Sequence, residues 1–336
     1  MLNLATLKKY DVSGMYKVYD QWPKIARETY LSSQDVVDFG KIDHIVFAGM
    51  GGSGTIGDIL SSILSKTNTH VAVVKGYHLP NTVDSKTLVV TTSVSGNTAE
   101  TLSVLESARR TKCKLVAFTS DGKMQDYCMN HKVEFRKIPK IHSPRASFPV
   151  FFYTILKVLE PILPVKKNDV LESIKELEKT KKIISSENLG KDNTSLQLAE
   201  WVSGIPVIYY PFGLQAAAVR FKNSLQENAK RHAMVEDIIE AGHNNIVSWE
   251  KKDKVQPILL EGTDDYVKTK QRWGIIKKYF HMNKINYKEV HSVKGSIISK
   301  LINLIYVLDY STIYLSAISK IDPSPTKSIE FIKKLS

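Results

Sequence analysis

Short apolar runs that each enter a turn rich in glycine or hydroxyl side chains constrain the fold of this chain most. One run covers 43–48 and leads into 49–54, Gly-Met-Gly-Gly-Ser-Gly. A second covers 87–92 and leads into 93–98, Ser-Val-Ser-Gly-Asn-Thr. Uninterrupted apolar runs of this length are typical of parallel strands that are buried on both faces. Helical patterns follow both turns, to about Leu64 and about Arg110.

The same rhythm of strand, turn and helix recurs along the chain. Further strands are predicted at 70–74, 114–119, 133–138, 205–210, 255–260 and 286–290, with mainly helical segments at 1–40, 146–203, 213–229, 265–281 and 296–319. This alternation predicts an α/β fold with right-handed crossovers. We expect two similar halves, 1–150 and 151–336, each a central, mostly parallel sheet flanked by helices.

Length and composition agree with a soluble protein of two domains. The chain has 336 residues, of which 43% are hydrophobic, enough for two cores without disulfides or metals. Cys113 and Cys128 stand apart from each other and from any histidine cluster, so neither a disulfide nor a zinc site is expected. No apolar run reaches the length of a bilayer span, and the first residues lack a signal pattern. We therefore expect a cytoplasmic protein that binds no membrane.

The formal net charge of +13 favours anionic partners, either nucleic acid or phosphorylated metabolites. The lysines are dispersed among acidic residues, most densely over 166–182, which is also typical of a solvated helix face. No nucleic-acid-binding module is evident. We therefore expect no nucleic-acid partner.

The turn at 49–54 follows a strand and opens a helix. Its glycines let the backbone approach a ligand closely, and a helix N-terminus attracts anions. The spacing departs from the dinucleotide fingerprint, and the next strand ends in Lys75 rather than an acidic residue. The Gly-Lys-Ser/Thr ending of a P-loop is also missing. Taken alone, this turn leaves cofactor binding and phosphate binding open.

The turn at 93–98 favours phosphate. It brings three hydroxyls to a helix N-terminus, where one would suffice as a cap. Hydroxyls and backbone N–H groups can bind phosphate oxygens without a fixed countercharge. The predicted phosphate-binding residues of the two turns are Gly52, Ser53, Ser93, Ser95 and Thr98.

The Ser-x-Ser-Gly-Asn-Thr turn after a buried strand resembles the phosphate loop of the sugar-isomerase (SIS) domain family. Further segments narrow the resemblance to the archaeal-type bifunctional phosphoglucose/phosphomannose isomerases, over nearly the whole chain: Gly49–Gly54, Ser143-Pro144-Arg145, the stretch Phe221–Lys230, His243-Asn244, Ile246-Val247 and Trp249-Glu250. Val94 departs from the pattern, because the family usually has tyrosine there, and this changes a wall of the pocket.

The resemblance implies reversible isomerisation of glucose 6-phosphate and mannose 6-phosphate with fructose 6-phosphate, through ring opening and a cis-enediol. It implies no metal and no cofactor; His232 and His243 also lack ligand spacing. Glu227 falls at the position of the catalytic base, near the end of a predicted helix, although the pattern alone favours a solvent-facing glutamate. Arg145 would stabilise the enediolate. His243 would assist ring opening from the neighbouring subunit of a homodimer.

The resemblance also places a threonine and a lysine seven residues apart near the C-terminus, where Thr326 and Lys333 fit. Lys333 would contact the ring-oxygen region, and Thr326 would favour the C2–C3 rotation that admits a mannose-type substrate. Lys327 and Lys334 lie close by, so the choice of lysine stays open, as does a simple basic tail.

The alternative is a non-catalytic SIS module that senses a sugar phosphate. Such regulators usually carry a separate DNA-binding or kinase domain, for which the two halves leave no room. The joint presence of Glu227, His243 and a C-terminal lysine favours the enzyme. The sequence does not give the ratio of glucose to mannose activity. It also does not say whether the enzyme acts in glycolysis or in gluconeogenesis.

Overall fold

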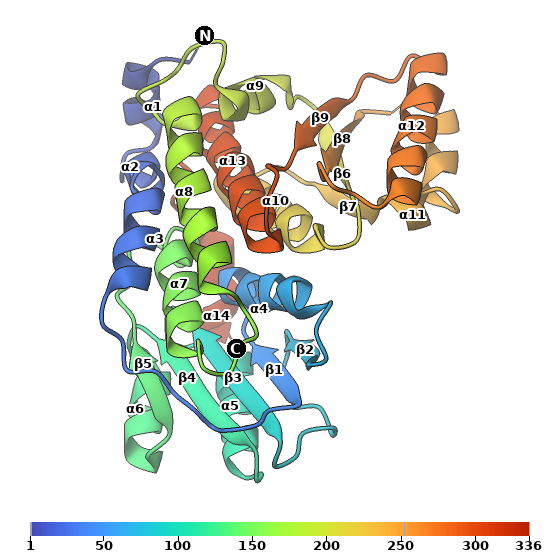
Figure 1. The fold of residues 1–336 in the computed structure, drawn as a ribbon. Coiled ribbons are helices and arrows are strands. Elements are labelled where there is room, and N and C mark those ends of the chain that lie inside the picture. The colour runs from blue at the N-terminus through green and yellow to red at the C-terminus, as the bar shows by residue number, and fades with distance from the viewer. Residues whose placement is uncertain (1, 252, 336) are drawn as a thin grey trace. The chain divides into compact units, whose positions relative to one another are not determined.

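A computed structural model describes residues 2–251 and 253–335 of the chain, without the side chain of Lys334. The chain packs as two compact units, which can be followed by colour in Figure 1. The five-strand unit comprises Gln21–Lys167 and the C-terminal helix α14 (Lys327–Leu335). The four-strand unit comprises the residues up to Asp20 and Asn168–Thr326. The domain boundary at residue 150 stays a prediction, because packing units and sequence domains need not share their ends.

The sheet of the five-strand unit has the strand order β2-β1-β3-β4-β5 in its described part, and all of its pairs are parallel. Every residue of the interior strand β1 is buried, as its apolar run predicts. The strands are β1 (His44–Ala48), β2 (His70–Val74), β3 (Thr87–Ser93), β4 (Lys114–Thr119) and β5 (Glu134–Lys137).

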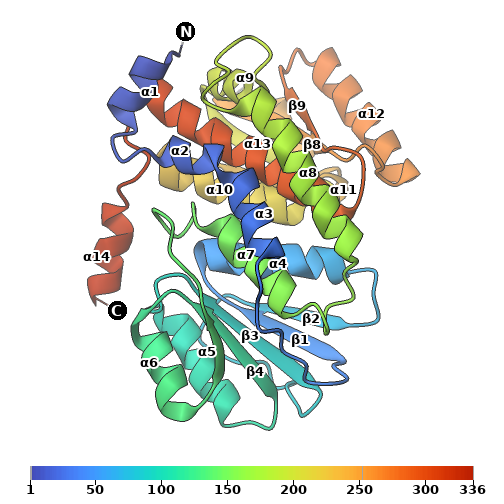
Figure 2. The ribbon, with the colours of Figure 1, turned by 60° about the vertical axis from the view of Figure 1, so that its left-hand side comes forward.

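Helices cover both faces of this sheet (Figure 2). On one face, Val46 and Val89 pack against Val104 of helix α5 (Ala99–Arg109), beside α6 (Gly122–His131). On the other lie α4 (Gly51–Leu64) and α7 (Phe148–Val158), with α3 (Trp22–Leu31) against α7. A Cβ added at Gly57 of α4 would lie 2.9 Å from Phe47 Cβ, so the glycine brings α4 close to the sheet.

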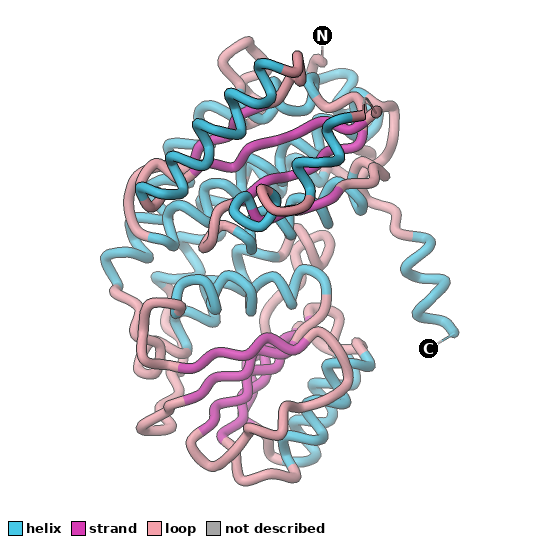
Figure 3. The backbone as a smooth tube through the Cα atoms, turned by 90° about the vertical axis from the view of Figure 1, so that its right-hand side faces the viewer, coloured by secondary structure: helices cyan, strands magenta, loops and turns pink. Residues whose placement is uncertain are grey.

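The sheet of the four-strand unit is also parallel, with the order β7-β6-β8-β9 among its described strands. Its strands are β6 (Ile205–Tyr210), β7 (Met234–Asp237), β8 (Val255–Glu261) and β9 (Lys288–His291). Figure 3 shows the strands of each sheet side by side. The predicted fold class, two α/β halves with parallel sheets, is confirmed. The sequence patterns did not indicate β7 or α6, because both are short and mix polar with apolar residues.

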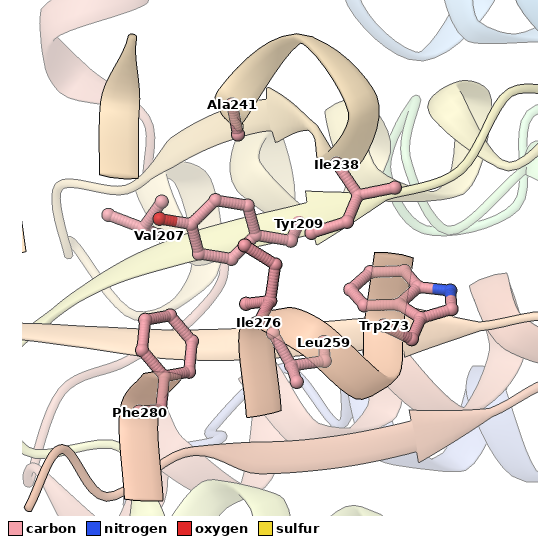
Figure 4. Packing of buried hydrophobic residues seen from close by; sticks show 8 residues of the cluster. All are labelled: Val207, Tyr209, Ile238, Ala241, Leu259, Trp273, Ile276 and Phe280. Atoms are coloured by element: carbon pink, nitrogen blue, oxygen red, sulfur yellow. The ribbon is translucent and has the colours of Figure 1, made fainter. Parts of the chain in front are cut away.

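A cluster of apolar side chains covers one face of this second sheet (Figure 4). It joins the strand residues Val207, Tyr209 and Leu259 to helices α11 (Ile238–Ala241) and α12 (Val267–Met282), through Ile238, Ala241, Trp273, Ile276 and Phe280. Burying such side chains stabilises the fold by about 1.5–3 kcal/mol each. Helix α10 (Gln215–Asn228) packs against β6 and β7 and against α13.

Helix α13 (Ile297–Ile318) is the centre of the four-strand unit. It is long and apolar enough to cross a membrane, so the expectation that no run reaches that length is wrong. In the structure 89% of its most apolar window is buried, which makes it a core helix. Helices α1 (Leu4–Tyr10), α2 (Met15–Asp20) and α9 (Thr194–Trp201) pack on it, and Tyr306 Oη donates to Tyr19 O at 2.8 Å. Helix α8 (Lys167–Ile184) is joined to it by a hydrogen bond from Asn303.

Candidate active site

Both turns that the sequence singled out lie where the strand order of the five-strand unit reverses. The chain runs from β1 to β2 on one side and then to β3 on the other. In open parallel sheets, ligands bind beyond the carboxyl ends of the strands at such a point. A Cβ at Gly49 would lie 2.9 Å from Thr92 O and 3.0 Å from Ser53, so only glycine lets the turns after β1 and β3 come this close. Gly52 and Ser53 then form the first turn of α4.

The hydroxyls after β3 face one another rather than the helix backbone. Ser93 Oγ and Thr98 Oγ1 are 3.0 Å apart. Thr98 is the N-cap of α5, yet within the described residues its side chain makes no capping bond. Simple capping therefore does not account for Thr98. Ser95 is half-exposed beside them, and Val94, the residue that departs from the resemblance, is buried.

The turn between β4 and α6 packs against the loop 93–98, called the hydroxyl loop below, and stabilises it. Gly96 has φ +64°, and a Cβ there would fall 1.6 Å from Asp121 O. Asn97 Oδ1 accepts a hydrogen bond from Lys123 N at 3.1 Å, and its Nδ2 donates to Ser95 O at 2.9 Å. Asn97 therefore stabilises the hydroxyl loop by linking it to the start of α6; it is called the strut below. The sequence analysis missed this role because the partners are 26 residues apart.

Arg145 lies in the turn that precedes α7, with only 6% of its surface exposed. Trp22 Nε1 donates to the neighbouring Ala146 O at 3.2 Å. Ser147 Oγ lies 3.0 Å from Ile141 O and 2.9 Å from Ser143 O. The turn is thus held firmly in the unit that carries both of the turns singled out by the sequence.

Glu227 lies in the last turn of α10, near the helix end as predicted, and is half-buried. A polar ladder holds this helix on α13: Arg220 Nη2 contacts Asp309 Oδ2 at 2.7 Å, and Ser224 Oγ donates to Asp309 Oδ1 at 2.8 Å. One residue beyond Glu227, Asn228 Nδ2 donates to Thr312 Oγ1 at 2.8 Å.

The sequence analysis missed the anchoring role of Asp309. Burial raises the pKa of its carboxyl although Arg220 opposes the shift. A buried acid needs such partners to remain in the core. A lone aspartate in the apolar stretch 297–318 was the available signal.

His243 lies in the loop between α11 and the 3₁₀ helix Asn245–Glu250, and its side chain is exposed. Its backbone N–H donates to Glu240 O at 2.8 Å. Further along the loop, Trp249 Nε1 donates to Tyr209 Oη at 2.7 Å, and that hydroxyl donates to Asn245. Burial raises the pKa of Tyr209, which keeps the donor protonated. The loop is therefore fixed while the imidazole faces outward.

The predicted C-terminal residues divide between the two units. Thr326 follows Pro325, whose carbonyl oxygen lies 2.8 Å from Lys230 Nζ near the end of α10. Lys333 is exposed on α14, and Lys327 begins that helix. The side chain of Lys334 lies outside the described residues.

Three possible metal ligands meet at the carboxyl ends of β8 and β9. Ligand atoms of Glu261, Glu289 and His291 lie within 4.8 Å of one another, a grouping that residue spacing did not reveal. Lys277 Nζ contacts Glu261 Oε1 at 2.8 Å and Glu289 Oε2 at 3.1 Å. A cation would have to displace this ammonium group. The two cysteines are free thiols, and burial raises the pKa of Cys128 to about 11.

Two parallel α/β units, with a hydroxyl-lined turn where the strand order reverses, define a protein of the SIS-domain class. Residues 39–144 match the SIS domain family, and residues 191–335 match the family described as the bacterial phospho-glucose isomerase C-terminal SIS domain. The chain is 32% identical, over 329 residues, to a bifunctional phosphoglucose/phosphomannose isomerase of Aquifex aeolicus, covering 96% of both chains. It therefore belongs to the bifunctional phosphoglucose/phosphomannose isomerase family, as the sequence resemblance predicted.

Two further likenesses show the range of this fold. A D-glucosamine-6-phosphate 4-epimerase of Sulfolobus acidocaldarius is 29% identical over 251 residues, covering 73% of this chain and 77% of that protein. The solved C-terminal domain of glucosamine-fructose-6-phosphate aminotransferase from Francisella tularensis has a TM-score of 0.69 at 15% identity. It covers 93% of this chain and 98% of that one. The second likeness concerns the fold alone.

Proposed function

We propose that this protein is a cytoplasmic, metal-independent isomerase that reversibly converts glucose 6-phosphate and mannose 6-phosphate to fructose 6-phosphate. The choice of substrates is supported by the family, because its relatives are named bifunctional phosphoglucose/phosphomannose isomerases. The observation that carries the proposal is the turn after β3, where Ser93 and Thr98 pair at a helix start that the Thr98 side chain leaves uncapped among the described residues. A phosphate dianion would complete that turn.

The phosphate is proposed to lie between the starts of α4 and α5. Ser53, Ser93, Ser95 and Thr98 would donate hydroxyl hydrogen bonds, with the backbone N–H of Gly52. The partial positive charge at helix N-termini, together with N–H groups that lack intrahelical partners, favours an anion there.

The chemistry needs one base and groups that open the ring. His243 would give a proton to the ring oxygen of the closed sugar as the bond from C1 to that oxygen breaks and the O1 hydroxyl loses its proton to solvent, and Lys333 would contact the same region. In the open aldose, the Glu227 carboxylate would take the proton from C2 while O1 gains a proton, which forms the cis-enediol. The carboxyl group would then return its proton to C1 as O2 loses its own, which leaves the ketose. Arg145 would stabilise negative charge on the enediolate oxygens.

Mannose 6-phosphate differs from glucose 6-phosphate only in the configuration at C2. Rotation about the C2–C3 bond of the enediol presents its other face to the same base. Thr326 is proposed to favour that rotation.

The activity is tested by coupled assays with each sugar phosphate after treatment with EDTA. We expect both isomerisations to persist, and Glu227→Gln to lower kcat by about 10²–10⁴-fold while calorimetry still detects sugar-phosphate binding. Glu106→Gln, a glutamate in the last turns of α5, is the matched control and should be neutral. Normal turnover by Glu227→Gln would refute the assigned base. Binding without turnover by the parent would favour a sensing module.

The proposed homodimer, with His243 supplied across the interface, has its own test. Glu227→Gln and His243→Ala proteins are inactive separately in this scheme. After subunit exchange, each mixed dimer would hold one intact site, which restores about a quarter of the parent activity. If His243 acted within its own subunit, mixing would restore nothing.

A further inference from the structure

Within residues 2–251 and 253–335, four lysines adopt the left-handed backbone conformation directly after helices, with φ between 53° and 60°. Glycine is the usual residue at such a position, because a Cβ costs about 1–2 kcal/mol there. Three of these lysines close their helices through the backbone N–H: Lys132 to Met129 O at 3.4 Å, Lys284 to His281 O at 3.1 Å and Lys320 to Ala317 O at 3.1 Å. The fourth, Lys230, has an additional set of contacts through its side chain.

The Lys230 ammonium group points at main-chain carbonyls of two separate segments. It donates to Glu227 O in the last turn of α10. It also lies 2.8 Å from Pro325 O and 3.5 Å from Pro323 O, 95 and 93 residues further along the chain. An ammonium group has three donors, and a cation is favoured at the negative end of a helix. The side chain therefore bridges the end of α10 and the turn over 322–326.

The turn over 322–326 is conformationally restricted, so fixing one part of it also fixes the rest. Pro323 and Pro325 fix their own φ angles. Ser324 N donates to Asp322 Oδ1 at 2.9 Å, and the Ser324 hydroxyl pairs with the hydroxyl of Ser13. Thr326 follows directly. Holding the two proline carbonyls therefore holds Thr326.

We propose that Lys230 is a positioning residue, whose ammonium group fixes the 322–326 turn, and with it Thr326, against the helix end that carries Glu227. This role rests on the proposed function, in which Glu227 is the base and Thr326 admits the mannose-type substrate. Loss of the ammonium group leaves the base in place but loosens Thr326.

Lys230→Gly and Lys284→Gly form a matched pair for testing this role. Both changes put glycine at a left-handed helix end and relieve the same backbone strain, so Lys284→Gly should maintain or raise the melting temperature, and Lys230→Gly should raise it less because its contacts are lost. Only Lys230→Gly removes the bridge. We expect amide exchange at Ser324 and Thr326 to become at least about tenfold faster in Lys230→Gly alone, because these amides then open more readily.

Turnover separates positioning from a purely structural role. In Lys230→Gly, kcat with mannose 6-phosphate should fall about tenfold or more, and further than kcat with glucose 6-phosphate, since small displacements of reacting groups are costly. KM for fructose 6-phosphate should change less than about twofold, because the phosphate loops are untouched. Lys230→Arg should restore part of the mannose activity, and Lys284→Gly should match the parent.

Unchanged exchange in Lys230→Gly would overturn the bridge. Faster exchange with an unaltered ratio of mannose to glucose turnover would overturn the positioning role. An inactive parent would refute the proposed function, and the positioning role with it. An active parent with an unaltered Lys230→Gly variant would refute the positioning role alone.

Discussion

The two sheets share a parallel architecture but differ in the chemistry at the helix starts that follow their strands. In the five-strand unit, hydroxyls gather at the start of α5, and Thr98 does not cap it within the described structure. In the four-strand unit, carboxylates of the chain occupy two such places, the starts of α11 and α13, whereas α10 and α12 have no side-chain cap among the described residues. Asp237 Oδ1 accepts from Ile239 N at 2.8 Å at the start of α11. Glu172 Oε2 accepts from Ser296 N at 2.9 Å at the start of α13.

In the proposed function, this difference assigns different tasks to two units of the same fold. A helix start that already holds a carboxylate repels a further anion, whereas a start lined by hydroxyls attracts one. The assignment of the phosphate to the five-strand unit therefore follows from the loop side chains, since both units have the same fold. In the proposed reaction, the acid–base groups Glu227 and His243 belong to the four-strand unit instead. Four substitutions test this contrast.

Gly96→Ala should have the largest effect, because it breaks the hydroxyl loop itself. The new Cβ would lie 1.6 Å from Asp121 O at a residue with φ +64°. We expect a loss of at least about 3 kcal/mol in the free energy of unfolding, or a displaced loop that no longer binds sugar phosphate. Chemical unfolding and calorimetric binding measure the two outcomes. Gly274→Ala, where an added Cβ meets nothing within 4 Å, is the control.

Thr98→Asp would give α5 a carboxylate like those at the starts of α11 and α13. Aspartate is a good N-cap, so stability should be kept or raised. Binding of sugar phosphate should weaken by about 100-fold, because the new charge repels the dianion at close range. Thr98→Asn supplies a cap without charge and should bind much better than Thr98→Asp. Equal affinity of the two variants would place the phosphate elsewhere.

Glu172→Gln removes a carboxylate from the start of α13. Hydrogen bonds from Ser296 and Ser299 lower the pKa of Glu172 below its usual value of 4.5. A lowered pKa in the folded state stabilises the protein above pH 4.5, and this contribution is lost as the pH falls through the folded value. The variant should therefore unfold more easily by about 1–2 kcal/mol at pH 7, with the difference shrinking at acidic pH. A difference that is independent of pH would contradict this account.

Asp237→Ala should have the smallest effect of the four. It removes the N-cap of α11 and should cost about 1 kcal/mol, whereas Asp237→Asn should cost less because asparagine also caps. Thermal unfolding of the two variants gives the comparison. An alanine variant as stable as the parent would show that this carboxylate does not support the helix start.

Helices and strands marked by a local apolar pattern were predicted from the sequence, and those without such a pattern were not. The strands over 70–74, 114–119 and 205–210 coincide with β2, β4 and β6, because each is one apolar run bounded by polar residues. Helix α6 and strand β7 lack such runs.

The residues of the candidate site also fall into two groups, those recognised from a local motif and those whose role depends on distant partners. The hydroxyl loop and Glu227 stand in short motifs, so they were found at the sequence level. The strut Asn97, the anchor Asp309 and the bridge Lys230 acquire their roles from residues 26 to 95 positions away. No local pattern encodes such pairings.

The sequence by itself determined the α/β class, the two turns rich in glycine and hydroxyl side chains and the family, because apolar periodicity and short motifs depend on neighbouring residues. Only the tertiary structure decided which of the described helix starts lack a side-chain cap and which are occupied by the chain's own carboxylates. It also decided which of the four left-handed lysines bridges two segments. Those outcomes depend on packing that brings distant residues to hydrogen-bonding distance, and that geometry exists only in the folded chain.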